Sequence, residues 1–361
     1  MTAFRLYNKN NIQSLNGIRG FAVLLVLLSH ASNRGINIHP DLCFSGAGVY
    51  GVFLFFVLSA FLLTRQFIHN APSCYKKSIK FVKTYLTRRI LRIYPLFIIS
   101  LFIYFALDNL GLSIHEISIK DIAEHIFLLN GIGIFWTIPI EFQYYLLLPL
   151  VFYIFTNIKS NSKKLISTAI FISLWSLFFP PEFTTNVITF LPIFVLGSLA
   201  AFASSKIEHY NQTTHNTFTT KIIDLVAIAS LITFIISIPS YYNVIFSTNI
   251  VRTEFHDEFI FYSILSCTLI LSVTHSDGLM KKTMECKFLV FWGNVSFSAY
   301  LLHLVIIKFL QLLVLPSPIL WLVYMFLTAV VSYLSYKYIE LPVSIFKNEK
   351  TLSYSKSETY R

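Results

Sequence analysis

The chain alternates between long apolar stretches and short polar or charged connections. A helix needs about 20 mainly apolar residues to cross the hydrocarbon core of a bilayer. Stretches that approach or exceed this length predict an all-α, polytopic membrane protein with about ten transmembrane helices. The expected spans are 15–33, 47–69, 93–112, 138–157, 165–181, 187–204, 222–243, 259–275, 288–313 and 317–339.

The overall composition agrees with a membrane protein. Of the 361 residues, 55% are hydrophobic and only 12% are charged, which is about half the charge of a soluble domain. A soluble core could not bury apolar surface of this extent. We expect one membrane domain over residues 1–342, followed by a polar cytoplasmic tail over 343–361.

The placement of lysine and arginine predicts the orientation, because cytoplasmic segments of membrane proteins are enriched in both. With the N-terminus inside, only Arg34, Lys120 and Arg252 lie outside and Lys308 lies within a span. All other basic residues are then on the inner side, and both termini are cytoplasmic. The net charge of +11 therefore describes the inner face, and contact with anionic lipid explains it without a nucleic-acid partner.

The first expected span, LNGIRGFAVLLVLLSHASN, contains Arg19 and His30. Eleven residues make roughly three helical turns, so both side chains leave one face of the helix, about 16 Å apart along its axis. An ionisable residue within a membrane is costly and marks a candidate functional site. The pair predicts a polar track that runs into the membrane.

The most basic segment of the chain is KKSIKFVKTYLTRRILRIYP. Arg89 and Arg92 are three residues apart and project from one helix face, with Arg88 beside them. Guanidinium groups bind phosphates in a bidentate manner, so the segment suits a polyanionic ligand such as a nucleotide or coenzyme A. The alternative is a positively charged anchor that contacts anionic lipid headgroups.

Three ionisable side chains, His30, Glu141 and His303, are expected in the outer half of three different spans. A contact between His30 and Glu141 is feasible, and a carboxylate that orients an imidazole is a recurring general-base arrangement. Each residue alone also suits a structural role: Glu141 at the interface, His303 as a hydrogen-bond partner. Trp136 and Tyr145 fit an aromatic belt equally well.

Six segments, taken together and in order, resemble the integral-membrane acyltransferase family 3, which includes bacterial O-antigen and other cell-surface glycan O-acetylases. The resemblance runs from about Leu15 to Pro342. Phe53, Ala60 and Leu304 depart from the family pattern, in which an acid, a glycine and a proline are usual. The segments are LNGIRGFAVLLVLLSH, GVFLFFVLSAFLLT, RRILRIYPLF, FWTIPIEFQYYLLLP, WGNVSFSAYLLH and YIELP.

The resemblance implies transfer of an acyl group from cytoplasmic acyl-coenzyme A to a hydroxyl of an extracytoplasmic glycan or glycolipid. His30 would be the general base, with Glu141 as its orienting or substrate-binding partner. Direct transfer and a covalent acyl-enzyme are both compatible with this chemistry. The expected coenzyme-binding residues are Arg19, Arg88, Arg89 and Arg92, and the expected substrate-binding residues are Trp136, Tyr145 and His303.

The resemblance also implies acetyl as the acyl group, by frequency in the family, and a bacterial cytoplasmic (inner) membrane as the location. The acceptor could be lipopolysaccharide, capsule, exopolysaccharide, an oligosaccharide or a small hydrophobic molecule. We expect no metal site and no bound cofactor, with acyl-coenzyme A as co-substrate. The alternative function is a proton-coupled transporter or flippase, in which intramembrane His and Glu form a proton relay.

Overall fold

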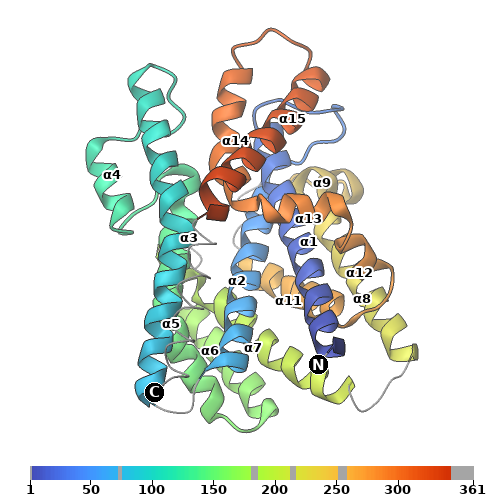
Figure 1. Cartoon of the computed structure of the whole chain (residues 1–361). Coiled ribbons are helices and arrows are strands. Elements are labelled where there is room, and N and C mark those ends of the chain that lie inside the picture. The colour runs from blue at the N-terminus through green and yellow to red at the C-terminus, as the bar shows by residue number, and fades with distance from the viewer. Residues whose placement is uncertain (1, 72–74, 180–185, 212–216, 251–257, 343–361) are drawn as a thin grey trace.

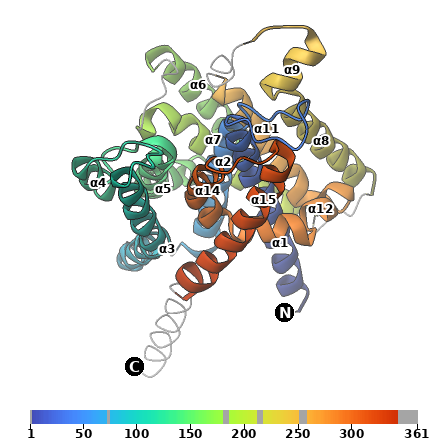
Figure 2. The same cartoon turned by 90° about the horizontal axis from the view of Figure 1, so that it is seen from above.

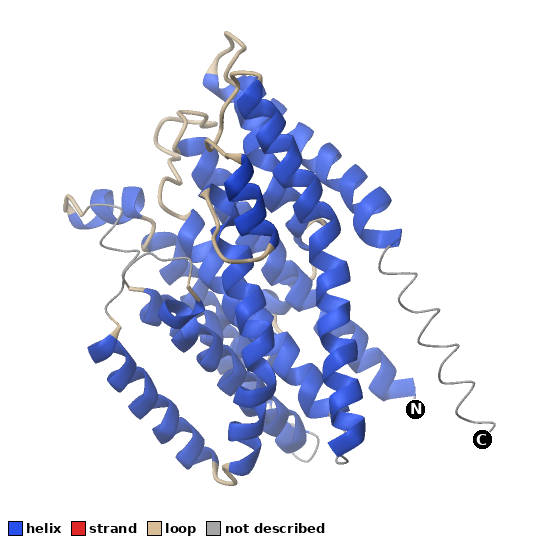
Figure 3. Ribbon diagram, turned by 90° about the vertical axis from the view of Figure 1, so that its left-hand side faces the viewer, coloured by secondary structure: helices blue, strands red, loops and turns tan. Residues whose placement is uncertain are grey.

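The computed structural model describes residues 2–71, 75–179, 186–211, 217–250 and 258–342, and this part of the chain folds into helices and loops only (Figure 3). The expected tail, 343–361, lies outside the described residues. The helices are α1 (Thr2–Ser32), α2 (Gly48–Asn70), α3 (Tyr75–Asn109), α4 (Ile119–Ile126), η1 (Gly133–Trp136), α5 (Thr137–Asn157), α6 (Asn161–Phe178), α7 (Val187–Asn211), α8 (Thr217–Ile236), α9 (Pro239–Phe246), α11 (Phe259–His275), α12 (Leu279–Met284), α13 (Lys287–Asn294), α14 (Ser296–Leu310), α15 (Ser317–Ser335) and the π-helix η2 (Tyr336–Glu340).

The described residues contain six helices long and apolar enough to cross a membrane, or up to eight if two bent helix pairs each count as one span. The chain is thus an all-α, multi-pass membrane protein, and the expected number of about ten spans is not confirmed. The expected span 259–275 is a shorter apolar helix, α11. The expected span 165–181 lies in α6 as far as Phe178, and its last two residues lie outside the described residues; α6 is not among the candidate spans. Lys163 and Lys164 lie in the first turn of α6 and lower its hydropathy.

Two expected spans, 222–243 and 288–313, are broken by sharp bends. Helices α8 and α9 meet at 90°, and α13 and α14 meet at 79°. Pro239 begins α9 and has no backbone N–H to continue the α8 hydrogen-bond ladder, so the break falls before it. At the second bend, Val295 leaves the helical region with φ −96° and ψ 8°. Both segments stay apolar across the break, so hydropathy alone cannot show it.

Helix α1 lies near the centre of the molecule, against α2, α13 and α14 (Figures 1 and 2). Glycines allow its backbone to approach α13 closely. A Cβ on Gly20 would lie 1.9 Å from the carbonyl oxygen of Leu289, and one on Gly293 would lie 1.8 Å from that of Asn16. Small residues at a crossing permit backbone contact between membrane helices. This crossing fixes the depth and rotation of α1, and therefore of Arg19 and His30.

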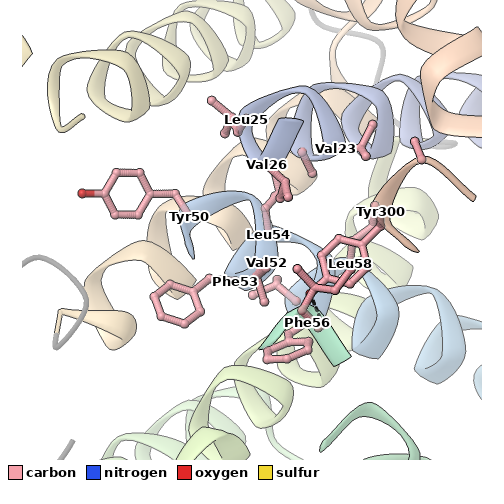
Figure 4. Packing of buried hydrophobic residues seen from close by; sticks show 14 of the residues in the cluster. Val23, Leu25, Val26, Tyr50, Val52, Phe53, Leu54, Phe56, Leu58 and Tyr300 are labelled. Atoms are coloured by element: carbon pink, nitrogen blue, oxygen red, sulfur yellow. Dashed lines mark hydrogen bonds between the residues drawn. The ribbon is translucent and has the colours of Figure 1, made fainter. Parts of the chain in front are cut away.

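Helix α2 packs against α1 on one side and against α7 and α11 on the other. Side chains of α1 and α2 share one apolar cluster with Tyr300 of α14 (Figure 4). Phe53, at the position where the family usually has an acid, is fully buried and contacts the rings of Phe190 and Phe259. Phe53 therefore has a role in hydrophobic packing, at a position where the family usually has an acid.

Outward-facing apolar side chains surround this core. Leu177 and Phe178 at the end of α6 are 78% and 74% exposed, and Phe326 on α15 is 67% exposed. Exposure of such groups to water would be costly, whereas lipid accommodates them. The peripheral helices therefore present a surface suited to a bilayer.

Candidate active site

A cavity of about 210 Å³ brings together five residues that the sequence predicts. Arg19 comes from α1, Arg89 and Arg92 from α3, and Glu141 and Tyr145 from α5. The spacing in α3 places both of its arginines on one face, as expected. Three guanidinium groups thus share the cavity with a single carboxylate, which gives it the electrostatics of an anion-binding site.

The carboxylate of Glu141 does not neutralise these arginines by direct pairing. Its Oε1 accepts hydrogen bonds from the hydroxyls of Ser59, at 2.6 Å, and Tyr145, at 2.5 Å. Within the described residues, no arginine lies within ion-pair distance of it. Neutral donors therefore hold Glu141 against α2, and the guanidinium groups keep their capacity to bind an anion.

The guanidinium groups themselves have few protein partners. Arg89 donates from Nη2 to Gln66 at 3.3 Å and lies over the rings of Tyr85 and Tyr145. Its Nε is buried without a partner in the described structure. Arg19 and Arg92 make no hydrogen bond or ion pair to any described residue. Arg92 is exposed and Arg19 is half-buried, so both guanidinium groups are accessible to an anionic ligand. The buried Nε of Arg89 lacks the partner that buried charged groups normally have, and the arrangement suits a polyanionic ligand.

A second cavity, of about 260 Å³, adjoins the first and shares Arg19 and Arg92 with it. Arg88 also lines this cavity, together with Asn16, Asn294 and Glu340. Glu340 ends the π-helix η2 and accepts a hydrogen bond from the hydroxyl of Ser298 on α14. All four arginines that the sequence assigns to the coenzyme therefore lie along two adjoining cavities.

A third cavity, of about 320 Å³, contains His30 and Trp136. It shares Val52 and Tyr300 with the cavity of the three arginines. Tyr300 donates to the carbonyl oxygen of Ile134 at 2.7 Å and accepts from Thr137 at 3.2 Å, which fixes its ring where the two cavities meet. The arginines and His30 are thus at opposite ends of three neighbouring cavities.

His30 and His303 form a hydrogen-bonded pair. His30 Nδ1 lies 2.7 Å from His303 Nε2, and the two ring planes differ by 2°. His303 is fully buried on α14, behind His30. The structure therefore gives His30 an imidazole as its orienting partner.

The surroundings of His303 determine the tautomer of both rings. Its Nδ1 lies 2.8 Å from the carbonyl oxygen of Tyr300 and 3.1 Å from that of Ala299. A carbonyl oxygen only accepts, so Nδ1 of His303 bears the proton, and its Nε2 is the acceptor in the neutral ring. His30 must then donate from Nδ1, which leaves the lone pair of its ring on Nε2. This is the protonation state that a general base requires.

Replacing His303 with leucine should remove the acceptor and leave the Nδ1–H of His30 without its partner. We expect kcat to fall on the order of 10- to 100-fold, as loss of one buried hydrogen bond implies, with little change in KM for the donor. The matched variant His303→Gln keeps a carbonyl oxygen as acceptor and should recover part of the activity. Nitrogen NMR of the His30 ring would show a mixture of tautomers in the leucine variant; a single unchanged tautomer would contradict the assignment.

The structure shows where the remaining predicted site residues lie. Glu141 lies with the arginines, held there by Ser59, and His303 takes the orienting position that the sequence analysis gave to Glu141. Tyr145 lines the arginine cavity, whereas Trp136 lines the His30 cavity. His303 lines none of these cavities because it is buried behind His30.

Sequence reasoning missed three residues of the His30 cavity: Tyr300, Arg34 and His115. Tyr300 precedes His303 by one helical turn, and this spacing could have placed it on the same face. Arg34 and His115 come from loops, for which spacing gives no signal. Within the residues that the structure describes, no group of three or more His, Cys, Asp or Glu could hold a metal ion.

Residues 12–337 match the family described as the Acyltransferase domain. The chain therefore belongs to this acyltransferase family, and the predicted resemblance is confirmed. It is 26% identical over 376 residues to a Staphylococcus aureus (strain COL) protein with the provisional name O-acetyltransferase SACOL0978. It is 25% identical over 375 residues to O-acetyltransferase OatA of S. aureus (strain NCTC 8325).

Both alignments cover 94% of this chain but only 58% of the relative. The chain thus spans little more than half the length of these curated relatives. No solved structure matches the chain.

Proposed function

We propose that this protein is a membrane O-acyltransferase that transfers an acyl group, specifically acetyl, from acyl-coenzyme A to a hydroxyl of a cell-envelope glycan. The donor binds from the cytoplasm, and the acceptor binds at the opposite face of a bacterial inner membrane. The observation that carries the proposal is the series of neighbouring cavities, with a cluster of four arginines at one end and a tautomerically fixed histidine at the other. Membership of the acyltransferase family and the names of the S. aureus relatives support the reaction class.

The charge of the arginines supports the assignment of the donor end. Arg88, Arg89 and Arg92 bind the phosphates of the coenzyme through charge-assisted hydrogen bonds. Arg19 lies on both arginine cavities and contacts the part of the donor that passes from one to the other. The coenzyme arm then extends toward Tyr300, so that the thioester reaches the junction with the His30 cavity. The distribution of lysine and arginine predicts that this side is cytoplasmic.

The transfer step follows from the tautomer of His30. Its Nε2 takes the proton of the acceptor hydroxyl while the oxygen attacks the thioester carbonyl carbon. The new C–O bond forms and the C–S bond breaks. The proton held on His30 then passes to the departing thiolate, so that coenzyme A leaves as the thiol. His303 stabilises the transient imidazolium by accepting from its Nδ1–H.

The proposal is tested by mass spectrometry of cell-envelope glycans from cells that have the protein, lack it, or carry His30→Ala. One acetyl group should be present on a glycan of the first cells and missing from the other two. The same glycan and radiolabelled acetyl-coenzyme A, given to the purified full chain in liposomes, should yield labelled glycan. Transport of an unmodified glycan without labelling would contradict the proposal and favour the transporter alternative.

A further inference from the structure

The His30 cavity contains a cation that the transfer chemistry does not use. Arg34 follows the end of α1 and lines this cavity with His30, Trp136 and His115. Its side chain is partly buried. No carboxylate is among the residues that line the cavity, and Arg34 makes no ion pair with any described residue. A partly buried guanidinium without a counter-ion suits an anionic ligand.

His115 provides a hydrogen-bonding group beside Arg34 but no charge. Its ring stacks on Tyr104, with centroids 6.0 Å apart, and its Nε2 is buried without a partner within the described structure. Burial, together with the charge of Arg34, lowers the pKa of His115 to about 4. The ring is therefore neutral near pH 7, and the positive charge of the cavity belongs to Arg34. One anionic group on a ligand is therefore enough to balance the charge of Arg34.

The backbone of the loop holds His115 in place. Gly133 has a φ of +56°, and a Cβ at this position would lie 2.2 Å from the ring of His115. No other residue type could keep both this conformation and this contact. Trp136, one turn further along, presents an apolar ring surface to the same cavity, a surface on which the C–H face of a sugar can pack.

We infer that the acceptor is a saccharide with an anionic group, a carboxylate or a phosphate, which Arg34 binds while Trp136 contacts the sugar face and His30 reaches the reacting hydroxyl. This inference rests on the proposed function for the identity of the pocket as the acceptor site. It narrows the acceptor from any hydroxyl compound to acidic saccharides. It also gives the otherwise unneutralised Arg34 a partner.

The test compares methyl glucuronide with the neutral methyl glucoside as probes for the purified full chain in detergent, by ligand-observed NMR. A third probe, glucose 6-phosphate, shows whether the His30 cavity prefers a phosphate or a carboxylate. An added charge-assisted hydrogen bond should give at least one acidic probe about tenfold higher affinity than the glucoside. Arg34→Gln should abolish this preference, whereas Arg34→Lys should keep part of it because the charge remains.

Two controls separate this pocket from the rest of a basic protein. Lys120→Gln removes an exposed cation from the first turn of α4 without touching the cavity, and the preference should persist in it. Saturating coenzyme A is present in every measurement, so that the arginines of the donor end do not bind the acidic probes. Under this condition, equal affinity for acidic and neutral probes in the unmodified chain, or a preference that survives in Arg34→Gln, would overturn the inference.

This experiment uses neither acyl donor nor turnover, so its result is independent of the proposed reaction. Transfer to a neutral glycan, together with equal affinities for the acidic and neutral probes, would overturn the inference of an acidic acceptor but not the proposed function. A retained preference for acidic probes in a protein that transfers no acyl group would instead refute the proposed function.

Discussion

Replacing His30 with alanine is expected to lower acyl transfer by about 10²- to 10⁴-fold, the range over which a positioned general base contributes to catalysis. The substitution removes the ring nitrogen that accepts the hydroxyl proton. It does not touch the arginine cavities, so coenzyme A should bind the variant as it binds the unmodified protein. The measurement is the initial rate of acetyl transfer by purified protein in liposomes, with coenzyme affinity measured in parallel.

The matched control for this prediction is His69→Ala. His69 lies in the last turn of α2 and is exposed, so its loss should leave transfer unchanged. A His30→Ala protein that keeps normal transfer would remove His30 from the mechanism. Loss of transfer together with loss of coenzyme binding would indicate a folding defect, and the milder His30→Gln variant would then decide the question through its kcat.

The second large effect is expected when Arg89 and Arg92 are both replaced by glutamine. Each charge-assisted hydrogen bond to a phosphate contributes about 1.5–3 kcal/mol, so the double variant should bind coenzyme A at least about 100-fold more weakly. Isothermal titration of the purified chain with coenzyme A measures this directly. Affinity for the unmodified chain should also fall as salt concentration rises.

Exposed cations of the same helix provide the comparison. Lys80 and Lys83 lie on α3, about two to three turns before the arginines, and both are exposed. A Lys80→Gln, Lys83→Gln double variant loses the same charge without touching either arginine cavity, and its affinity should change little. Equal losses in the two double variants would assign binding to the general field of the inner face, and no loss in the arginine variant would remove both residues from the donor site.

The sequence was sufficient to predict the elements that carry the site. The spacing of Arg19 and His30 on one helix face, and of Arg89 and Arg92 on another, follows directly from helical geometry. The sequence also predicted that His30 and His303 lie in the outer half of separate helices. Their direct contact could not be predicted, because it depends on how closely α1 and α14 approach, and this is fixed by tertiary packing between distant segments.

Differences between prediction and structure have physical causes as well. Hydropathy measures the length of an apolar run and not its direction, so the bends before Pro239 and at Val295 could not be predicted from it. A contact between Glu141 and His30 was considered feasible because depth was counted from the end of an apolar run. In the structure, Ser59 and Tyr145 hold Glu141 among the arginines. Arg34 and His115 are loop residues, and only the folded chain brings them into the His30 cavity.

In the proposed mechanism, donor and acceptor meet from opposite sides of the membrane. Proteoliposomes test it most directly, with membrane-impermeant acetyl-coenzyme A supplied outside and the glycan identified by mass spectrometry placed either in the lumen or outside. In protein molecules whose donor side faces outward, the acceptor side faces the lumen. We therefore predict acetylated glycan when the acceptor is in the lumen and none when both substrates are outside. Efficient transfer with both substrates on the same side would contradict the account.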